Sequence, residues 1–187
     1  PEEPKKTWNH PGGKLLDLGS GSLSQKELLA VLLGSGTGKR TAMEIADLIL
    51  DEFVHLPGLH RRQWPPYGPV TVAMLCRVPG VKRAKAARIW AAVEIARRMH
   101  ALWGRRPDLE SQDPPDARLI ADILGAGVQG QSALQMAEAL LRKYGSLAGL
   151  YGVNMDGWVK LRGLNSVKAV RLCAALELYH RIKHWIK

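Results

Sequence analysis

Apolar residues along this chain recur with the spacing of α-helices rather than of β-strands. Between 42 and 53, the apolar residues at 42, 45, 46, 49 and 53 have the period of one buried helical stripe. Ser24 and Glu27 have the spacing of a capping box, which predicts that a helix begins there. No segment alternates apolar and polar residues as a half-buried strand would. The fold class is therefore expected to be all-α.

Glycine and proline mark the ends of the expected helices. Tight turns are predicted at Gly34–Gly38 and Pro79–Gly80, and the proline-rich segment Gly104–Pro115 is typical of a linker. Helices are expected over 24–33, 39–53, 71–77, 83–103, 117–124, 131–144, 155–160 and 167–186.

The chain contains an internal duplication. The sequence LLGSG at 32–36 recurs as ILGAG at 123–127, a shift of 91 residues, whereas Val78–Ala86 matches Leu161–Ala169 with a shift of 83. The change in shift requires eight extra residues in the first copy, within 54–74. We therefore expect two tandem domains, 14–103 and 116–187, joined by a linker at 104–115.

Each copy has two places where a helix ends, the chain turns over glycine, and another helix begins. The unpaired amides and the positive dipole end of the second helix can bind an anion without any side chain. Glycine suits such a corner because no Cβ blocks the close approach of a phosphate. Contacts of this kind follow the position of phosphates and not the identity of bases.

Two stretches carry a resemblance to known proteins. Val78–Ala86 is similar to the helix-hairpin-helix motif of non-sequence-specific DNA binders, and Leu23–Thr37 resembles the N-terminal region of the bacterial RadC family. The resemblance covers 15–103, with a degenerate second copy at 117–182, and implies two hairpins in each copy. RadC-like proteins usually continue into a metalloprotease-like domain with a His-x-His sequence. This chain has no His-x-His, so we expect that domain to be absent.

The resemblance also exposes departures from the family pattern. Lys82 and Asn165 stand where the second glycine of the hairpin is usual, and Arg162 stands at the position of Pro79. Because lysine tolerates a positive φ poorly, we expect a distorted turn at Lys82, and a looser turn at Arg162.

Composition and charge favour a polyanionic partner. The chain of 187 residues has a formal net charge of +10 and a pI near 9.9. The excess is concentrated at 77–106 and 160–187, each of which begins at a hairpin. No apolar run is long enough to span a membrane, and two cysteines do not make a disulfide framework or a four-thiolate zinc site. We expect a bacterial cytoplasmic protein that associates with the nucleoid.

We therefore predict a non-enzymatic protein that binds the phosphate backbone of duplex or branched DNA without sequence preference. It would be an accessory to DNA repair, recombination or uptake, with other repair or recombination proteins as further partners, and with no cofactor or metal. The candidate DNA-binding residues are Gly34, Gly36, Lys39, Arg40, Gly80, Val81, Lys82, Arg83 and Lys85 in the first copy, and Gly125, Gly127, Gly163, Leu164, Asn165, Ser166 and Lys168 in the second.

Two other functions stay open. A protein–protein adaptor is favoured by the missing hairpin glycines at 82 and 165, and a DNA lyase or glycosylase by a lysine beside the hairpin, Lys82 or Lys85. The lyase lacks an aspartate anywhere in 83–103. Among the aromatic residues, Trp64 in the insertion is the best candidate for a functional contact, next to Arg61 and Arg62.

Overall fold

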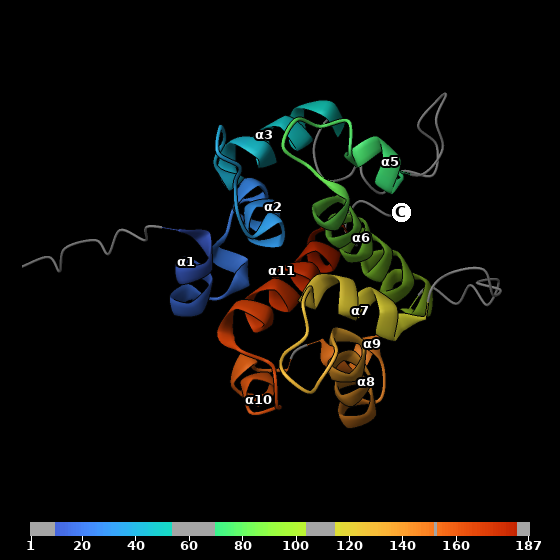
Figure 1. Cartoon of the computed structure of the whole chain (residues 1–187). Coiled ribbons are helices and arrows are strands. Elements are labelled where there is room, and N and C mark those ends of the chain that lie inside the picture. Colours follow the sequence, from blue (N-terminus) through green and yellow to red (C-terminus); the bar gives the residue numbers. More distant parts are fainter. Residues whose placement is uncertain (1–9, 54–69, 104–114, 152, 183–187) are drawn as a thin grey trace, which may run out of the picture.

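The computed structural model describes residues 10–53, 70–103, 115–151 and 153–182, and these form helices and no strand (Figure 1). The expected all-α class is confirmed for this part of the chain. The helices of the first half are α1 (Pro11–Leu18), the short 3-10 helix η1 (Ser20–Ser22), α2 (Gln25–Leu33), α3 (Ala42–Phe53), α5 (Val72–Leu75) and α6 (Arg83–Trp103). Those of the second half are α7 (Asp116–Leu124), α8 (Ala133–Tyr144), α9 (Leu147–Leu150), α10 (Met155–Val159) and α11 (Ser166–Ile182).

Local sequence explains where the helices begin. The predicted capping box is confirmed: the Glu27 amide donates to Ser24 Oγ at 3.1 Å, and the Ser24 amide donates to the Glu27 carboxylate at 2.7 Å. Helix α3 starts three residues later than expected, because the amide of Thr37 donates to the carbonyl of Arg40 at 2.7 Å and closes a turn. Helices α1, η1 and α9 were not predicted, since they are short and rich in glycine or serine.

The two long helices α6 and α11 lie side by side at the centre of the molecule (Figure 1). The helices α2, α3, α5 and α6 of the first half correspond to α7, α8, α10 and α11 of the second. Helix α2 packs against α11 of the other half, and α7 packs against α6 in the same way. These reciprocal contacts are those of an approximate two-fold axis between the halves.

Both halves contribute to one continuous hydrophobic core. Leu32 and Ile89 from the first half are fully buried in it, as are Leu124 and Leu172 from the second. Burial of each such side chain contributes about 1.5–3 kcal/mol to folding. Except for Pro115, the expected linker lies outside the described residues, so the domain boundaries stay a prediction.

Ion pairs and capping bonds reinforce the contact between the halves. Arg98 on α6 binds Glu94 at 2.8 Å and reaches Asp116, the first residue of α7, at 2.7 Å. Burial would lower the pKa of Arg98, but its hydrogen bonds to the two carboxylates raise it overall. At the other end, Arg181 on α11 donates to the carbonyl of Leu23 at 2.6 Å.

Candidate nucleic-acid interface

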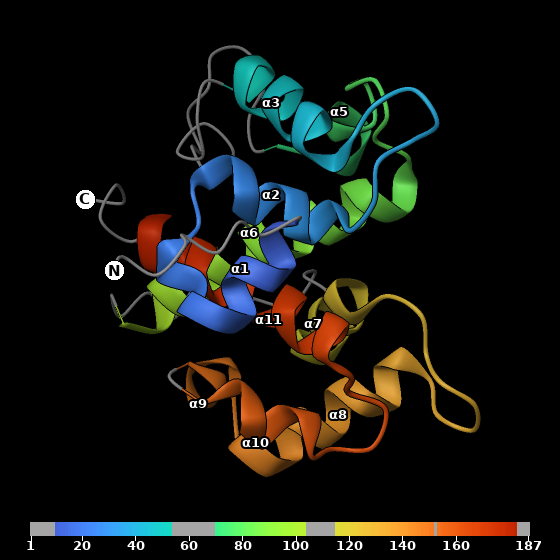
Figure 2. The ribbon, with the colours of Figure 1, turned by 90° about the vertical axis from the view of Figure 1, so that its left-hand side faces the viewer.

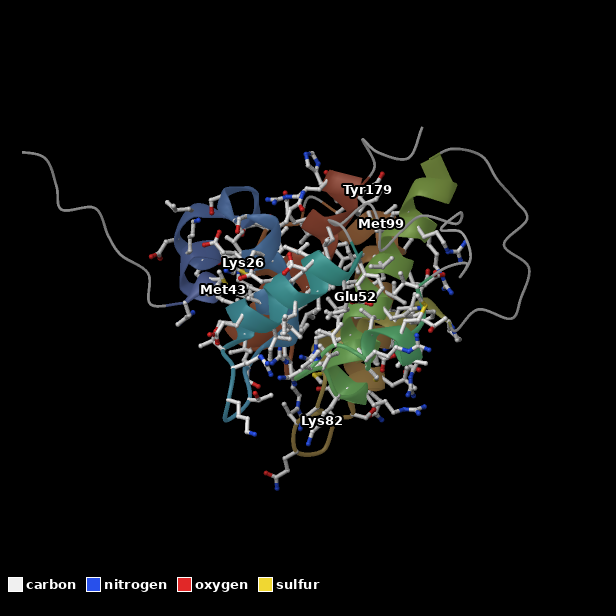
Figure 3. All side chains as sticks on the ribbon, turned by 90° about the horizontal axis from the view of Figure 1, so that it is seen from above. Lys26, Met43, Glu52, Lys82, Met99 and Tyr179 are labelled. Carbon is white, nitrogen blue, oxygen red and sulfur yellow. The ribbon has the colours of Figure 1, made fainter. Side chains whose placement is uncertain are left out.

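The four glycine corners lie on one side of the molecule. Figures 2 and 3 show the α2–α3 and α7–α8 loops projecting from the same side, with Lys82 of the α5–α6 turn beside them. The fourth corner belongs to the same surface, because a Cβ on Gly163 would lie 3.1 Å from Val128 of the α7–α8 loop. We call this surface the corner face; it comprises residues 34–41, 78–83, 125–132 and 161–166.

Close backbone contacts build the first-half corners. A Cβ on Gly36 would overlap the carbonyl oxygen of Arg40 and lie 2.8 Å from Thr41 Cα, so only glycine fits. Gly80 takes a φ of 95°, and a Cβ there would lie 2.9 Å from Ile45. The ammonium group of Lys85 donates to the carbonyl of Gly36 at 3.0 Å and approaches that of Gly80 at 3.5 Å. This lysine therefore holds the two corners together.

The second-half corners repeat this construction. A Cβ on Gly127 would lie 2.5 Å from the carbonyl oxygen of Gln131, and Gly163 takes a φ of 85°. Lys168, the equivalent of Lys85, donates to the carbonyl of Gly163 at 3.2 Å. Its second contact is the Sδ of Met136 at 3.7 Å, so the two halves share the glycine turns and the lysine bond to the second corner.

The hairpin turns close in the same way in both halves, contrary to expectation. The amide of Val81 donates to Val78 at 3.0 Å, and that of Leu164 donates to Leu161 at 3.1 Å. The helices that follow begin at equivalent positions, Arg83 and Ser166. Neither a lysine in place of glycine nor an arginine in place of proline changes the closure of the turn.

The predicted site residues fall into two groups. The exposed group is Lys39, Arg40, Lys82, Arg83, Asn165, Ser166, Gly34 and Gly127, and Gly36, Gly80, Gly125 and Gly163 are partly exposed. The inward group is Val81, Leu164, Lys85 and Lys168: the first two are 4% and 3% exposed and belong to the core. Burial lowers the pKa of Lys85 and of Lys168, whose ammonium groups face backbone carbonyls. Val81, Leu164 and Lys168 are therefore buried and Lys85 is partly buried, and all four position the corners.

Positive charge is unevenly distributed over the corner face. The duplication pairs Lys39, Arg40, Lys82 and Arg83 of the first half with Gly130, Gln131, Asn165 and Ser166 of the second. All four exposed cations are thus replaced by neutral residues. Exposed Val128 lies on the α7–α8 loop, and exposed Leu134 and Val167 lie in the first turns of α8 and α11 beside it. The first half of the corner face therefore carries four exposed cations, whereas the second carries the exposed Arg162 and apolar side chains.

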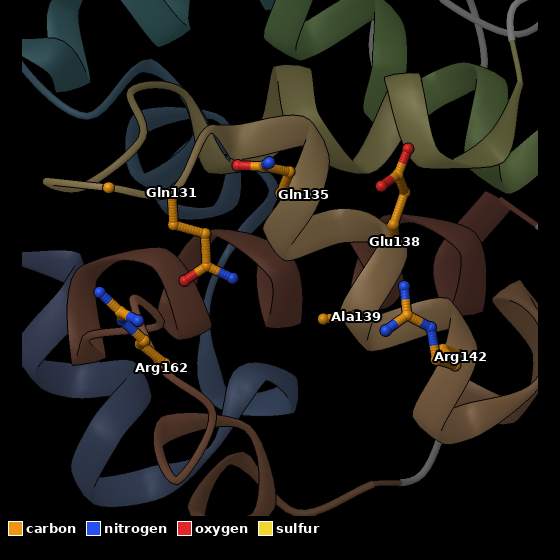
Figure 4. Close-up of a pocket in the computed structure, with 7 residues that line it drawn as sticks. Gln131, Gln135, Glu138, Ala139, Arg142 and Arg162 are labelled. Atoms are coloured by element: carbon orange, nitrogen blue, oxygen red, sulfur yellow. The ribbon is translucent and has the colours of Figure 1, made fainter.

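Two open hollows adjoin the corners. One, of about 740 Å³, follows residues 34–42 and includes Glu44. The Glu44 carboxylate accepts from the Thr41 amide at 2.6 Å, and this bond lowers the pKa of Glu44. The amide of Thr41, the residue before α3, is therefore already occupied. The other, of about 430 Å³, is flanked by Arg142 and Arg162 (Figure 4).

Several predicted residues lie elsewhere, and one pair was missed. Trp64 and the extra residues of the first copy, as far as 69, are outside the described residues. Several of the basic residues in 77–106 bind groups of the protein itself. Lys85 and Arg88 donate to backbone carbonyls, and Arg97 and Arg98 pair with Glu94. Sequence reasoning missed Arg88 and Arg171, which meet between the two Gly-x-Gly corners. The sequence could have indicated them, because the duplication places an arginine at both equivalent positions.

The comparisons with known proteins place the chain in a family. The model of the UPF0758 N-terminal family matches residues 6–87 and 112–170. This chain belongs to the UPF0758 N-terminal family. Its similarity to this family confirms the RadC-like resemblance of the N-terminal region.

Curated UPF0758 proteins are similar to parts of the chain. The protein of Carboxydothermus hydrogenoformans is 43% identical over 94 residues, which cover 50% of this chain and 38% of that protein. The protein of Trichodesmium erythraeum is 34% identical over 133 residues, or 70% of this chain and 52% of that protein. The chain therefore spans about two fifths to one half of the length of these relatives. No solved structure matches it.

The described helices carry two further negative findings. None of them combines the length and the apolar character that crossing a bilayer requires. Within the described ranges, no three His, Cys, Asp or Glu side chains gather closely enough to hold a metal ion.

Proposed function

We propose that this UPF0758 N-terminal chain binds DNA without sequence preference, by placing backbone phosphates against the corner face. The proposal is carried by one observation: four glycine corners share one side, and four exposed cations surround the first two. We further propose that the helix–corner–helix units are helix-hairpin-helix motifs in tandem. The chain would act as a binding module and not as an enzyme, at the bacterial nucleoid, in repair, recombination or uptake of DNA.

The start of α6 is the strongest anion site of the face in physical terms. The first amide with a bond there is that of Lys85, which donates to the carbonyl of Lys82 at 2.9 Å, so the three preceding amides point out of the helix. The dipole of this 21-residue helix adds partial positive charge at the same place. The exposed side chains of Lys82 and Arg83 add two full charges beside it. A phosphate would therefore meet amides, dipole and cations together.

The second half supports a weaker contact with DNA. Its corners offer the same backbone geometry, but the equivalents of Lys82 and Arg83 are Asn165 and Ser166. Since neutralisation of phosphates supplies most of non-specific affinity, the first half would dominate binding.

A second candidate function is favoured by one observation on the second half. Val128, Leu134 and Val167 are 38%, 39% and 55% exposed at or beside its corners. Exposed apolar side chains on one surface are typical of protein–protein contacts. The second half would then be an adaptor for a repair or recombination protein.

Fluorescence anisotropy of a labelled DNA duplex, titrated with the full chain at several salt concentrations, tests the DNA-binding proposal. The double variant Lys82→Glu/Arg83→Glu should bind at least about tenfold more weakly, and its salt slope should fall by about 2 because two phosphate contacts are lost. The charge-matched control is Arg118→Glu/Lys143→Glu, because these exposed residues lie at the helix ends opposite the α7–α8 corner.

The control should lose much less affinity than the double variant and keep its salt slope. Equal losses in both variants would mean that only total charge matters, and the corner face would not be the site. A folded parent chain that does not bind duplex at low salt would remove DNA binding and leave the adaptor function.

A further inference from the structure

Two arginines meet where the halves of the molecule join. Arg88 on α6 and Arg171 on α11 occupy equivalent positions of the duplication, 83 residues apart. The Nη1 of Arg88 donates to the carbonyls of Leu32 at 2.8 Å and Leu33 at 3.2 Å, at the end of α2. The Nη1 of Arg171 reaches the carbonyl of Leu124, at the end of α7, at 3.5 Å. Each guanidinium group is thus anchored at a Gly-x-Gly corner.

The two guanidinium groups converge on the glycines of both corners. The Nη2 of Arg88 lies 3.2 Å from the position that a Cβ would take on Gly125, and the Nη1 of Arg171 lies 3.5 Å from the same point. The Nη2 of Arg171 lies 2.7 Å from the corresponding point on Gly34. A side chain at Gly34 or Gly125 would occupy the space that the guanidinium groups now fill. Glycine at these two positions therefore allows the arginines to approach the corners.

The charge of this pair is not balanced within the described residues. Neither arginine has a carboxylate partner there, and the Nε of each is buried without an acceptor. The Nη2 groups have no acceptor in the described part of the chain either, but they are not buried. Burial and the proximity of Arg171 lower the pKa of Arg88 to about 10. The carbonyl ends of α2 and α7 offset only part of this repulsion.

We propose that Arg88 and Arg171 form a binding site for a phosphate group, between Gly34 and Gly125. The Nη1 groups bond to carbonyls and the Nε groups are buried, so the Nη2 group of each guanidinium is left to donate to the oxygens of one phosphate. A phosphate would relieve the repulsion between the arginines and would accept from the unpaired Nη2 groups. It could come from free phosphate or from a DNA backbone; the second source rests on the function proposed above, and the first does not.

The first test is thermal unfolding of the full chain in increasing inorganic phosphate, with chloride adjusted to keep ionic strength constant. Phosphate should raise the midpoint along a saturable curve, since a ligand of the folded state stabilises it. Arg88→Lys and Arg171→Lys keep the charge but lose the planar fork, so each should weaken the apparent phosphate affinity about tenfold. The control Arg118→Gln/Lys143→Gln, which removes two exposed charges away from the corners, should leave the curve unchanged.

A second measurement covers the case in which an arginine variant does not fold. In the parent chain, the side-chain Nε–H resonances of Arg88 and Arg171 should shift with the same saturation curve as the midpoint. The proposal would be overturned if these resonances did not move. It would also be overturned if phosphate changed the unfolding midpoint no more than chloride does.

The source of the phosphate is decided by DNA titrations of the same variants. If the site takes a backbone phosphate, both lysine variants should bind duplex about tenfold more weakly, and free phosphate should compete with DNA. If only the free-phosphate effect is lost, the site takes free phosphate. A phosphate site in a chain that does not bind DNA would uphold this inference while the proposed function fails.

Discussion

The second glycine of the α2–α3 corner offers a sharp test of how the corner face is built. In Gly36→Ala the new Cβ would overlap the carbonyl oxygen of Arg40, and its other near neighbours are backbone atoms of Thr41. The loop must therefore move. Movement breaks the 2.7 Å bond from the Thr37 amide to Arg40, worth about 1 kcal/mol, and adds about 1–3 kcal/mol of displacement in a packed region. We expect Gly36→Ala to lower the free energy of unfolding by about 2–4 kcal/mol, out of the roughly 5–15 kcal/mol of a typical domain.

The same loop provides the control. No heavy atom lies within 4 Å of a Cβ on Gly38, and the φ of Gly38 is not positive, so Gly38→Ala should be neutral or slightly stabilising. Urea unfolding followed by circular dichroism measures both variants. If Gly36→Ala unfolds at the urea concentration of Gly38→Ala, the close approach of the loop to Arg40 does not exist. If Gly36→Ala is destabilised but binds DNA normally once folded, the α2–α3 corner is not a contact.

Three further predictions concern a buried ion pair, thiol reactivity and the pH dependence of stability. Glu94→Gln should lower the free energy of unfolding by about 2–4 kcal/mol in the same urea assay, because Glu94 is 7% exposed and the charge of Arg98 would lose a buried partner; a loss below 1 kcal/mol would mean that Arg98 is satisfied without it. Burial raises the pKa of Cys173 to about 12, whereas Cys76 is exposed, so a thiol reagent near pH 8 should label Cys76 at once and the partly exposed Cys173 far more slowly. Because the unfolded thiol ionises near pH 9 and the folded one does not, Cys173 should also cost stability as the pH rises above 9, and Cys173→Ala should reduce that loss.

Much of the fold follows from the sequence because the signals were local. The capping box at Ser24 and the glycine at the end of α2 fix a helix within nine residues, without reference to distant contacts. Because the second half repeats the first, the same pattern shifted along the sequence also predicts helices α7 and α8. The packing of α2 on α11 and of α7 on α6 depends on contacts between residues far apart in the chain, and no local pattern encodes it.

The candidate site was predicted in outline and not in its detailed roles. Lys82 and Lys85 are both lysines beside a hairpin, yet one is exposed and the other bonds to the carbonyls of both first-half corners. The duplication distinguishes them: Lys85 is matched by Lys168, whereas Lys82 is matched by Asn165. A lysine that bonds to the backbone of the corners is present in both copies. A lysine that is exposed on the surface is present in only one. The same reasoning separates the paired arginines of the interior from the exposed arginines of the face.

This divergence of the second half predicts that its weakness in DNA binding is reversible. Ser166 is exposed at the start of α11, at the position that Arg83 holds on α6. Because the two turns close identically, Ser166→Arg should place a cation beside the same amides, steepen the salt slope by about 1, and tighten duplex binding several-fold. Glu52→Gln changes the net charge by the same amount at the far end of α3 and is the control for total charge. A gain in both variants would attribute the effect to net charge. No gain in Ser166→Arg alone would mean that the second-half corner does not approach the duplex, and that its exposed Val167 faces some other surface.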